Sequence, residues 1–133
     1  MGSKTRKARK MSNTAKDIFG NSWRDEHTQE GLEFIKELEQ MQTVVESDAG
    51  GSYEWDVYYA YWHTGRKRYY VIAGSGCSCN WISDGVDSLG DFQEFGTAQE
   101  VLRDFKLSHK ESGYGWSKDL INSTANAIRD FRE

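Results

Sequence analysis

Residues 53–79 contain most of the sheet-forming character of this chain, and they limit its possible folds more than any other stretch. Two runs rich in aromatic and β-branched residues, 53–62 and 67–73, flank a short segment that contains Gly65. This arrangement is typical of an antiparallel β-hairpin. Glycine, serine and both cysteines of the chain follow the hairpin at once. The rest of the chain therefore has to be organised around this hairpin.

The length of the turn sets the pairing of the two strands. A turn formed by Thr64 and Gly65 alone would place Val57 opposite Ile72. Alternation along each strand then assigns the side chains to two faces. The face expected to pack on the core carries Tyr53, Trp55, Val57, Tyr59, Tyr61, Tyr70 and Ile72. The other face carries Glu54, Asp56, Tyr58, Ala60, Trp62, Lys67, Tyr69 and Val71. An isolated hairpin is only marginally stable in water, so helices are expected to cover at least the first face.

One long amphipathic helix is predicted before the hairpin. Apolar residues recur at three- and four-residue steps from about Asp25 to Ser47, while glutamates occupy other positions around the helix. This spacing is typical of a helix with one buried side, and Asp25 or Thr28 can act as its N-cap. A small apolar anchor is expected to pack on the domain edge just before it, formed by Ile18, Phe19 and Trp23.

Two further helices are predicted after the hairpin. Residues 97–100 read Thr-Ala-Gln-Glu, a capping box that opens a helix expected to end near His109. Ser117 is expected to cap the last helix, and residues 80–96 to form an ordered loop with a short strand or helical turn. The sequence therefore predicts the α+β class: a small single domain with an antiparallel, hairpin-centred sheet packed against about three helices.

Charge is distributed unevenly along the chain. Its 133 residues fit one domain, and the formal net charge is −4. The first ten residues contribute +5, which leaves 12 basic and 21 acidic residues, a net −9, for the remainder. The basic residues of this start are Lys4, Arg6, Lys7, Arg9 and Lys10. We therefore expect a flexible basic arm at residues 1–16 and one acidic domain at residues 17–133. The arm is either a contact for nucleic acid phosphates or a solubilising tail.

The composition favours a protein of the cytoplasm. No apolar run approaches the roughly 20 residues that a membrane-spanning helix needs, and no secretory signal follows the basic start. Two cysteines spaced Cys-x-Cys are not expected to bridge each other easily, because so small a ring strains a disulfide. Unpaired thiols indicate a reducing compartment.

The segment after the second strand is a candidate turn motif, formed by Gly74, Ser75, Gly76, Cys77, Ser78, Cys79 and Asn80. Cys77 and Cys79 are suitable zinc ligands, although the other ligands would have to come from His27, His63 and His109, which have no paired spacing. A nucleophilic cysteine would need a positioned base. The simpler interpretation is that both thiols fill a tight turn. The glycines could cradle a phosphate, but the expected helix does not follow them directly.

A second candidate site lies on the other face of the hairpin, the one that carries Tyr58. We call it the mixed face, because aromatic rings lie there beside basic side chains. Its residues are Tyr58, Trp62, Arg66, Lys67 and Tyr69. Exposed rings beside cations can stack on bases or bind anionic groups of a partner. If helices cover this face as well, the same rings belong to the core.

Residues 68–79 read Arg-Tyr-Tyr-Val-Ile-Ala-Gly-Ser-Gly-Cys-Ser-Cys, after an aromatic strand and before a Phe-Gly-Thr-x-x-Glu helix start. This combination resembles a family of short, uncharacterised proteins encoded by bacteriophages of actinobacteria. The resemblance covers residues 53–105, and Asn80 stands where a proline would often follow the second thiol. It implies a phage-encoded protein that acts in the host cell, and it implies no particular chemistry.

Three functions remain open at this point. The first is a non-enzymatic accessory protein that binds a host macromolecule, in the first place a host protein, through the mixed face of the hairpin. The second is a nucleic-acid-binding protein led by the basic arm. The third is a small-ligand-binding protein or enzyme that uses the turn Cys77–Asn80. The absence of a spaced catalytic triad or carboxylate pair counts against an enzyme, and no cofactor, metal or membrane contact is expected.

Overall fold

The computed structural model describes residues 14–20, 26–109 and 115–133. Four helices, four strands and one 3-10 turn are defined in these ranges. In chain order they are α2 (Thr14–Phe19), α4 (Gln29–Glu39), β1 (Met41–Asp48), β2 (Glu54–His63), β3 (Arg68–Cys77), η1 (Leu89–Asp91), β4 (Gln93–Phe95), α5 (Ala98–His109) and α6 (Lys118–Asp130). The predicted α+β class is confirmed.

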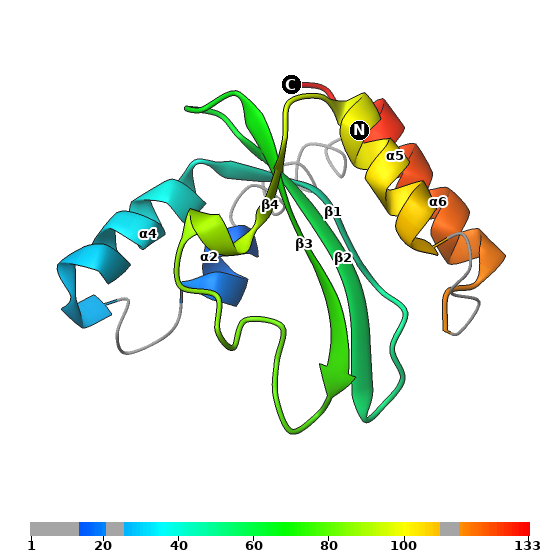
Figure 1. Ribbon diagram of the computed structural model, residues 1–133, viewed down its shortest axis with the longest axis horizontal. Coiled ribbons are helices and arrows are strands. Elements are labelled where there is room, and N and C mark those ends of the chain that lie inside the picture. The colour runs from blue at the N-terminus through cyan, green and yellow to red at the C-terminus, as the bar shows by residue number, and fades with distance from the viewer. Residues whose placement is uncertain (1–13, 21–25, 110–114) are drawn as a thin grey trace, which may run out of the picture.

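The four strands form one antiparallel sheet in the order β1-β2-β3-β4 (Figure 1). Tyr61 pairs with Tyr70 and His63 with Arg68, so the turn between β2 and β3 has four residues, not the two that were predicted. Lys67 takes a positive φ of 58° in this turn and donates its backbone N–H to the His63 carbonyl at 2.9 Å. The pairing is offset by two residues from the predicted one. Every residue within β2 and β3 therefore keeps its predicted face.

The prediction of one helix from about Asp25 to Ser47 is wrong in its second half. α4 ends at Glu39, and the next residues form β1, an edge strand of the sheet. A β-bulge between Thr43 and Val45 shifts the register of β1 against β2. The bulge breaks the strict alternation that identifies a strand. The apolar residues Met41, Val44 and Val45 of β1 are therefore spaced by three and four positions, as on one side of a helix.

Helices cover both faces of the sheet. α2 and α4 lie on one face, and α5 and α6 lie on the other (Figure 1). Phe19 of α2 stacks edge-to-face with Tyr61 and Phe92, with ring centroids 6.2 and 5.3 Å apart. Phe19 is thus the anchor expected from the sequence. α2 begins at Thr14, inside the stretch 1–16 expected to be a flexible arm; residues 1–13 and Trp23 lie outside the described residues.

Side-chain caps begin three of the helices where the sequence placed them. The side chain of Thr28 accepts the Gly31 N–H at 3.0 Å at the start of α4, and that of Ser117 accepts the Leu120 N–H at 3.1 Å at the start of α6. At the start of α5, the Thr97 side chain accepts the Glu100 N–H at 3.1 Å and the Glu100 side chain accepts the Thr97 N–H at 3.0 Å, which is a capping box.

Buried tyrosine hydroxyls on both faces are satisfied by carboxylates. Each of three hydroxyls donates to one carboxylate oxygen: Tyr58 to Asp104 at 2.8 Å, Tyr61 to Glu46 at 2.5 Å and Tyr69 to Glu133 at 2.6 Å. Burial raises the pKa of all three tyrosines, and the neighbouring carboxylate raises it further. The core of this small domain is therefore aromatic without leaving these hydroxyls unpaired.

Candidate binding surface at the open end of the hairpin

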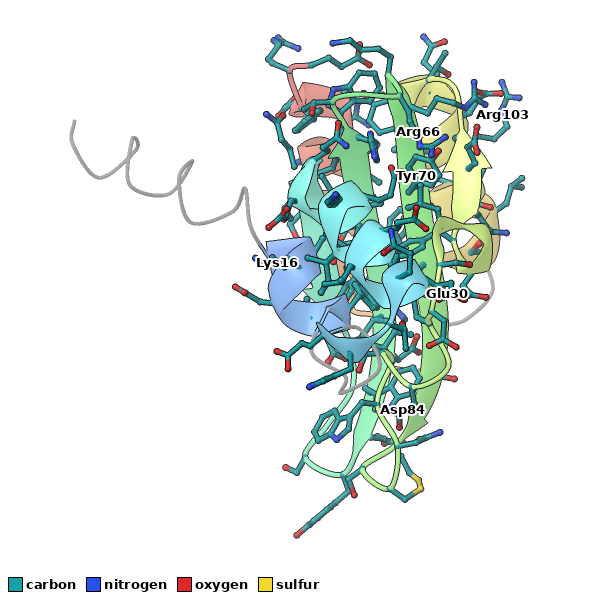
Figure 2. The ribbon with its side chains drawn as sticks, turned by 90° about the vertical axis from the view of Figure 1, so that its left-hand side faces the viewer. Lys16, Glu30, Arg66, Tyr70, Asp84 and Arg103 are labelled. Atoms are coloured by element: carbon teal, nitrogen blue, oxygen red, sulfur yellow. A yellow bond between two sulfur atoms is a disulfide. The ribbon has the colours of Figure 1, made fainter. Side chains whose placement is uncertain are left out.

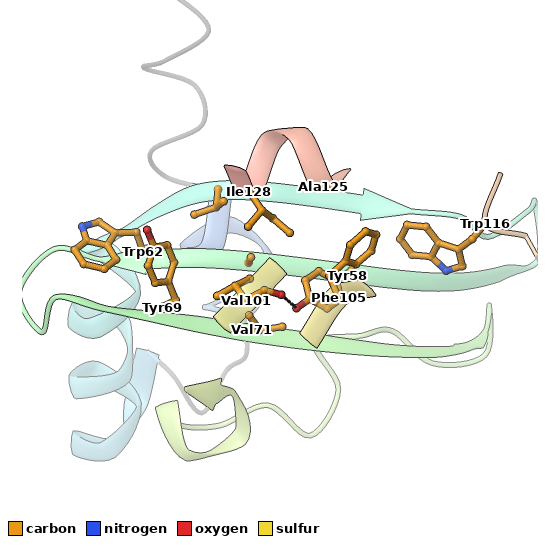
Figure 3. Close-up of a cluster of buried hydrophobic side chains, with 11 residues drawn as sticks. Tyr58, Trp62, Tyr69, Val71, Val101, Phe105, Trp116, Ala125 and Ile128 are labelled. Atoms are coloured by element: carbon orange, nitrogen blue, oxygen red, sulfur yellow. Dashed lines mark hydrogen bonds between the residues drawn. The ribbon is translucent and has the colours of Figure 1, made fainter. Parts of the chain in front are cut away.

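The aromatic surface predicted on the hairpin is part of the core. Tyr58 and Tyr69 are 0% exposed, and Trp62 is 5% exposed. Residues of α5 and α6 pack on these rings (Figure 3). The prediction that the three rings form an exposed contact surface is wrong, because the two C-terminal helices cover this face of the sheet.

The two basic residues of that predicted surface lie in the turn between β2 and β3, where both are exposed. Arg66 donates to the carboxylate of Glu37 on α4 from Nε at 3.1 Å and from Nη2 at 3.0 Å. The hydrogen bond from Arg66 is the main reason that the pKa of Glu37 is lowered. A hydrogen bond of 2.7 Å between His63 Nε2 and Glu37 Oε1 lowers this pKa further. Arg66 therefore ties the turn to α4. Lys67 has no ion pair with any described residue.

Two exposed aromatic rings lie at the opposite end of the hairpin, where β2 begins and β3 ends. Tyr53 is 80% exposed and Trp81 is 64% exposed. We call residues 53–56 and 74–84 the open end; Figure 2 shows it in the lower part of the view, around Asp84 and the disulfide. Tyr53 was predicted to face the core, but it precedes β2 and lies beyond the helices that cover the sheet.

Trp55 organises the turn motif that follows β3. Its indole Nε1 donates to the carbonyl oxygen of Asn80 at 2.7 Å and to that of Cys77 at 3.1 Å. The ring lies across Gly76, where a Cβ atom would come within 2.4 Å of Trp55 Cζ2. Glycine is therefore required at this position for a close approach, and the predicted motif from Gly74 to Asn80 is attached to β2 by one side chain.

Cys77 and Cys79 are joined in a disulfide. The prediction of two unpaired thiols is wrong, because the chain turns directly after β3 and brings the two Cα atoms to 5.3 Å, within the usual range for a disulfide. As a disulfide, the pair has no thiolate to offer to a metal or to a substrate. The inference of a reducing compartment from unpaired thiols loses its basis.

The histidines considered as zinc ligands are elsewhere. His63 lies at the turn end of the hairpin, where its Nδ1 accepts the Arg66 N–H at 3.0 Å, and His109 packs on Trp116 with ring centroids 4.2 Å apart. His27 is exposed near the start of α4. Within the ranges that the structure describes, no group of three or more His, Cys, Asp or Glu side chains could hold a metal ion.

A pocket of about 370 Å³ opens beside the disulfide. Residues from β2, β3 and two adjoining loops line it: Ala49, Gly50, Glu54, Trp55, Asp56, Ser75, Gly76, Cys77 and Gly115. Glu54 and Asp56 give the pocket two carboxylates, and neither forms an ion pair with a described residue. The open end can therefore offer aromatic surface and negative charge to a partner.

Sequence reasoning missed Tyr53 and Trp81 as surface residues. The available signal was their position, because each lies next to a polar or glycine-rich segment, 48–52 or 74–80, that cannot bury a large ring. The arm residues Lys4, Arg6, Lys7, Arg9 and Lys10 lie outside the described residues.

The outer side of α5 carries two shallower hollows of about 280 and 410 Å³, and both include Lys106 and Leu107. Leu107 is 68% exposed, but no Phe, Tyr, Trp, Asp or Glu side chain among the described residues lines either hollow. This helix therefore offers less to a partner than the open end does.

No helix in the described ranges combines the length and the hydropathy needed to cross a membrane. No curated protein and no solved structure matches the chain. One family matches residues 25–131, which include the whole sheet and the helices α4, α5 and α6. The chain therefore belongs to the family described as a domain of unknown function, DUF7574.

Proposed function

We propose that this chain is a phage-encoded accessory protein that binds a host protein, without catalysis, through the open end of its hairpin. The observation that carries this proposal is the pair of exposed rings, Tyr53 at 80% and Trp81 at 64%, on a surface that includes a pocket. Aromatic side chains are enriched at protein interfaces, where each supplies a large contact area at little cost in conformational entropy. The phage origin rests on the resemblance of residues 68–79 to actinobacteriophage proteins.

The local framework supports binding, because hydrogen bonds fix the backbone that carries the two rings before a partner arrives. Ser78 donates its backbone N–H to the Tyr53 carbonyl at 2.8 Å, and Trp81 donates its own to the Asp84 carboxylate at 3.0 Å. Trp55 fixes the turn that precedes Trp81 through its hydrogen bonds to the carbonyl oxygens of Cys77 and Asn80. A preorganised surface loses less conformational entropy on binding than a loose one does.

The test is partner capture from host lysate with the double variant Tyr53→Ser/Trp81→Ser. We expect its melting temperature to stay near that of the wild type, because exposed rings contribute little to the folded monomer. Proteins that the wild type retains should be lost. The matched control is Leu32→Ser/Leu107→Ser, which removes two other exposed apolar side chains, 44% and 68% exposed, from α4 and α5.

Two outcomes would contradict the proposal. If the Tyr53/Trp81 variant retains every partner of the wild type, the open end is not the contact surface. If nuclease treatment of the lysate abolishes capture and the variant does not, the nucleic-acid hypothesis based on the arm is favoured instead.

A further inference from the structure

Strand β3 is much longer than the strand on its outer side. β3 has ten residues, and β4 pairs only with Tyr69, Tyr70 and Val71. The outer edge of β3 from residue 72 to residue 77 therefore has no neighbouring strand among the described residues. Residues 74–77 of this stretch belong to the open end, and Ile72 and Ala73 lie directly next to it.

The direction of the backbone groups along this edge follows from the ladder. Ser78 donates to the carbonyl of Tyr53, which lies directly opposite it in the continued register, so even-numbered residues of β3 exchange hydrogen bonds with β2. Odd-numbered residues point their N–H and C=O groups away from β2. Among the described residues, none forms a hydrogen bond with the backbone of Ala73 or Ser75.

Nothing in the sequence of this edge discourages pairing. Natural sheets protect free edges with charged residues or proline. Residues 73–77 read Ala-Gly-Ser-Gly-Cys, without a charge or a proline, and both Ala73 and Ser75 are exposed. The edge is therefore a template for another strand.

The small residues of β3 also determine what an added strand would contact. Gly74, Ser75 and Gly76 leave the side chains of β2 accessible across β3. On one face the added strand would meet the ring of Trp55, which lies across Gly76. On the other face, Asp56 is opposite Ser75 and Glu54 is opposite Cys77, and both carboxylates line the pocket.

We propose that the outer edge of β3, at Ala73 and Ser75, accepts an extended segment of the partner protein as a fifth strand, with lysine or arginine side chains directed toward Glu54 and Asp56. This inference rests on the proposed function and states how the open end holds its partner. The main-chain hydrogen bonds hold the segment, and the two carboxylates select a basic one, as in other cases of strand addition. Long basic side chains can reach across Ser75 because its side chain is short.

The test uses a synthetic peptide of alternating lysine and valine, with an alternating glutamate and valine peptide as its control. We expect the lysine peptide to bind the wild-type protein and to slow amide hydrogen exchange at Ala73 and Ser75. Ser75→Pro removes one outward N–H and leaves the hydrogen bonds to β2 in place. Binding of the lysine peptide should become roughly tenfold weaker, the effect of one lost hydrogen bond. Ser75→Thr keeps the N–H and should bind as the wild type does.

A second variant keeps the test decisive if Ser75→Pro fails to fold. Glu54→Gln/Asp56→Asn leaves the backbone edge intact and should weaken the lysine peptide while leaving the melting temperature nearly unchanged. The inference is overturned if the lysine peptide does not bind, if it binds without slowing exchange at Ala73 and Ser75, or if the glutamate peptide binds equally well.

Partner capture separates the two proposals. If Tyr53→Ser/Trp81→Ser loses the partner while Ser75→Pro and Glu54→Gln/Asp56→Asn both keep it, the open end is the binding surface and strand addition is wrong. If all three variants keep the partner, the proposed function is wrong as well.

Discussion

Trp55 donates its indole N–H to the carbonyl oxygen of Asn80 at 2.7 Å, although the two residues are 25 positions apart in the sequence. The same N–H is shared with the carbonyl of Cys77 at 3.1 Å. One side chain of β2 therefore closes the turn that follows β3. The open end is therefore held by this contact as well as by the hairpin ladder, which continues to the pair Glu54 and Cys77.

The first prediction concerns the close approach of Trp55 to Gly76. Gly76→Ala should destabilise the protein by about 1–3 kcal/mol, the range for overpacking, because the new Cβ would meet the indole ring. In a Trp55→Ala background the same substitution should cost less. Denaturant unfolding of the four proteins of this cycle measures the coupling. Gly51→Ala is the control, since no atom lies within 4 Å of its Cβ position; equal costs at Gly76 in both backgrounds would exclude the contact.

The faces of the hairpin can be predicted from the sequence more securely than its pairing. Alternation assigns Tyr59 and Tyr61 to one face and Tyr58 to the other, and the four-residue turn does not change this because it moves the register by two residues. The turn length was not predictable, because Lys67 takes a positive φ that glycine usually supplies.

The sequence predicts the helices α5 and α6 but not which side chains of the hairpin they bury. The caps at Thr97 and Ser117 identify the starts of α5 and α6, but no local signal shows which face of the sheet these helices cover. Trp62 is an aromatic residue close to basic residues in the sequence, which suggested an exposed binding site, but the helices bury it. Tyr53 and Trp81 remain exposed because α5 and α6 do not cover that end of the hairpin.

The second prediction concerns Trp116, which is 4% exposed. Its indole Nε1 is buried and has no hydrogen-bond partner among the described residues. Trp116→Phe should therefore cost little, because it removes an unsatisfied donor together with part of the ring. Trp116→Ala should cost about 3–5 kcal/mol, since it leaves a cavity against Phe105 and His109. Thermal unfolding compares the two variants, and equal losses would show that the N–H has a partner in the folded protein.

The third prediction concerns pH. The hydrogen bond from Arg66 lowers the pKa of Glu37 from its ordinary value of 4.5, with a further contribution from His63, while burial opposes the shift. A carboxyl whose pKa is lower in the folded state stabilises the protein above its unfolded pKa, and the stabilisation is lost as the pH falls through the folded value. Glu37→Gln should thus lower the free energy of unfolding at pH 7, and the difference from the wild type should shrink below about pH 4.5. Glu33→Gln, on an exposed position of the same helix, is the control. A difference that stays constant down to pH 3 would assign the effect to packing.

The last prediction concerns the disulfide between Cys77 and Cys79. Because only one residue separates the two cysteines, the bond restricts the unfolded chain very little. Cys77→Ser/Cys79→Ser should therefore lower the free energy of unfolding by only about 1–2 kcal/mol. Intact mass measured before and after reduction reports whether the bond is present, and urea unfolding with and without a reductant reports its effect. In the double variant the reductant should have no effect on unfolding. If the purified wild type instead carries one equivalent of zinc that the double variant lacks, the two sulfur atoms act as thiolate ligands and the disulfide assignment is wrong.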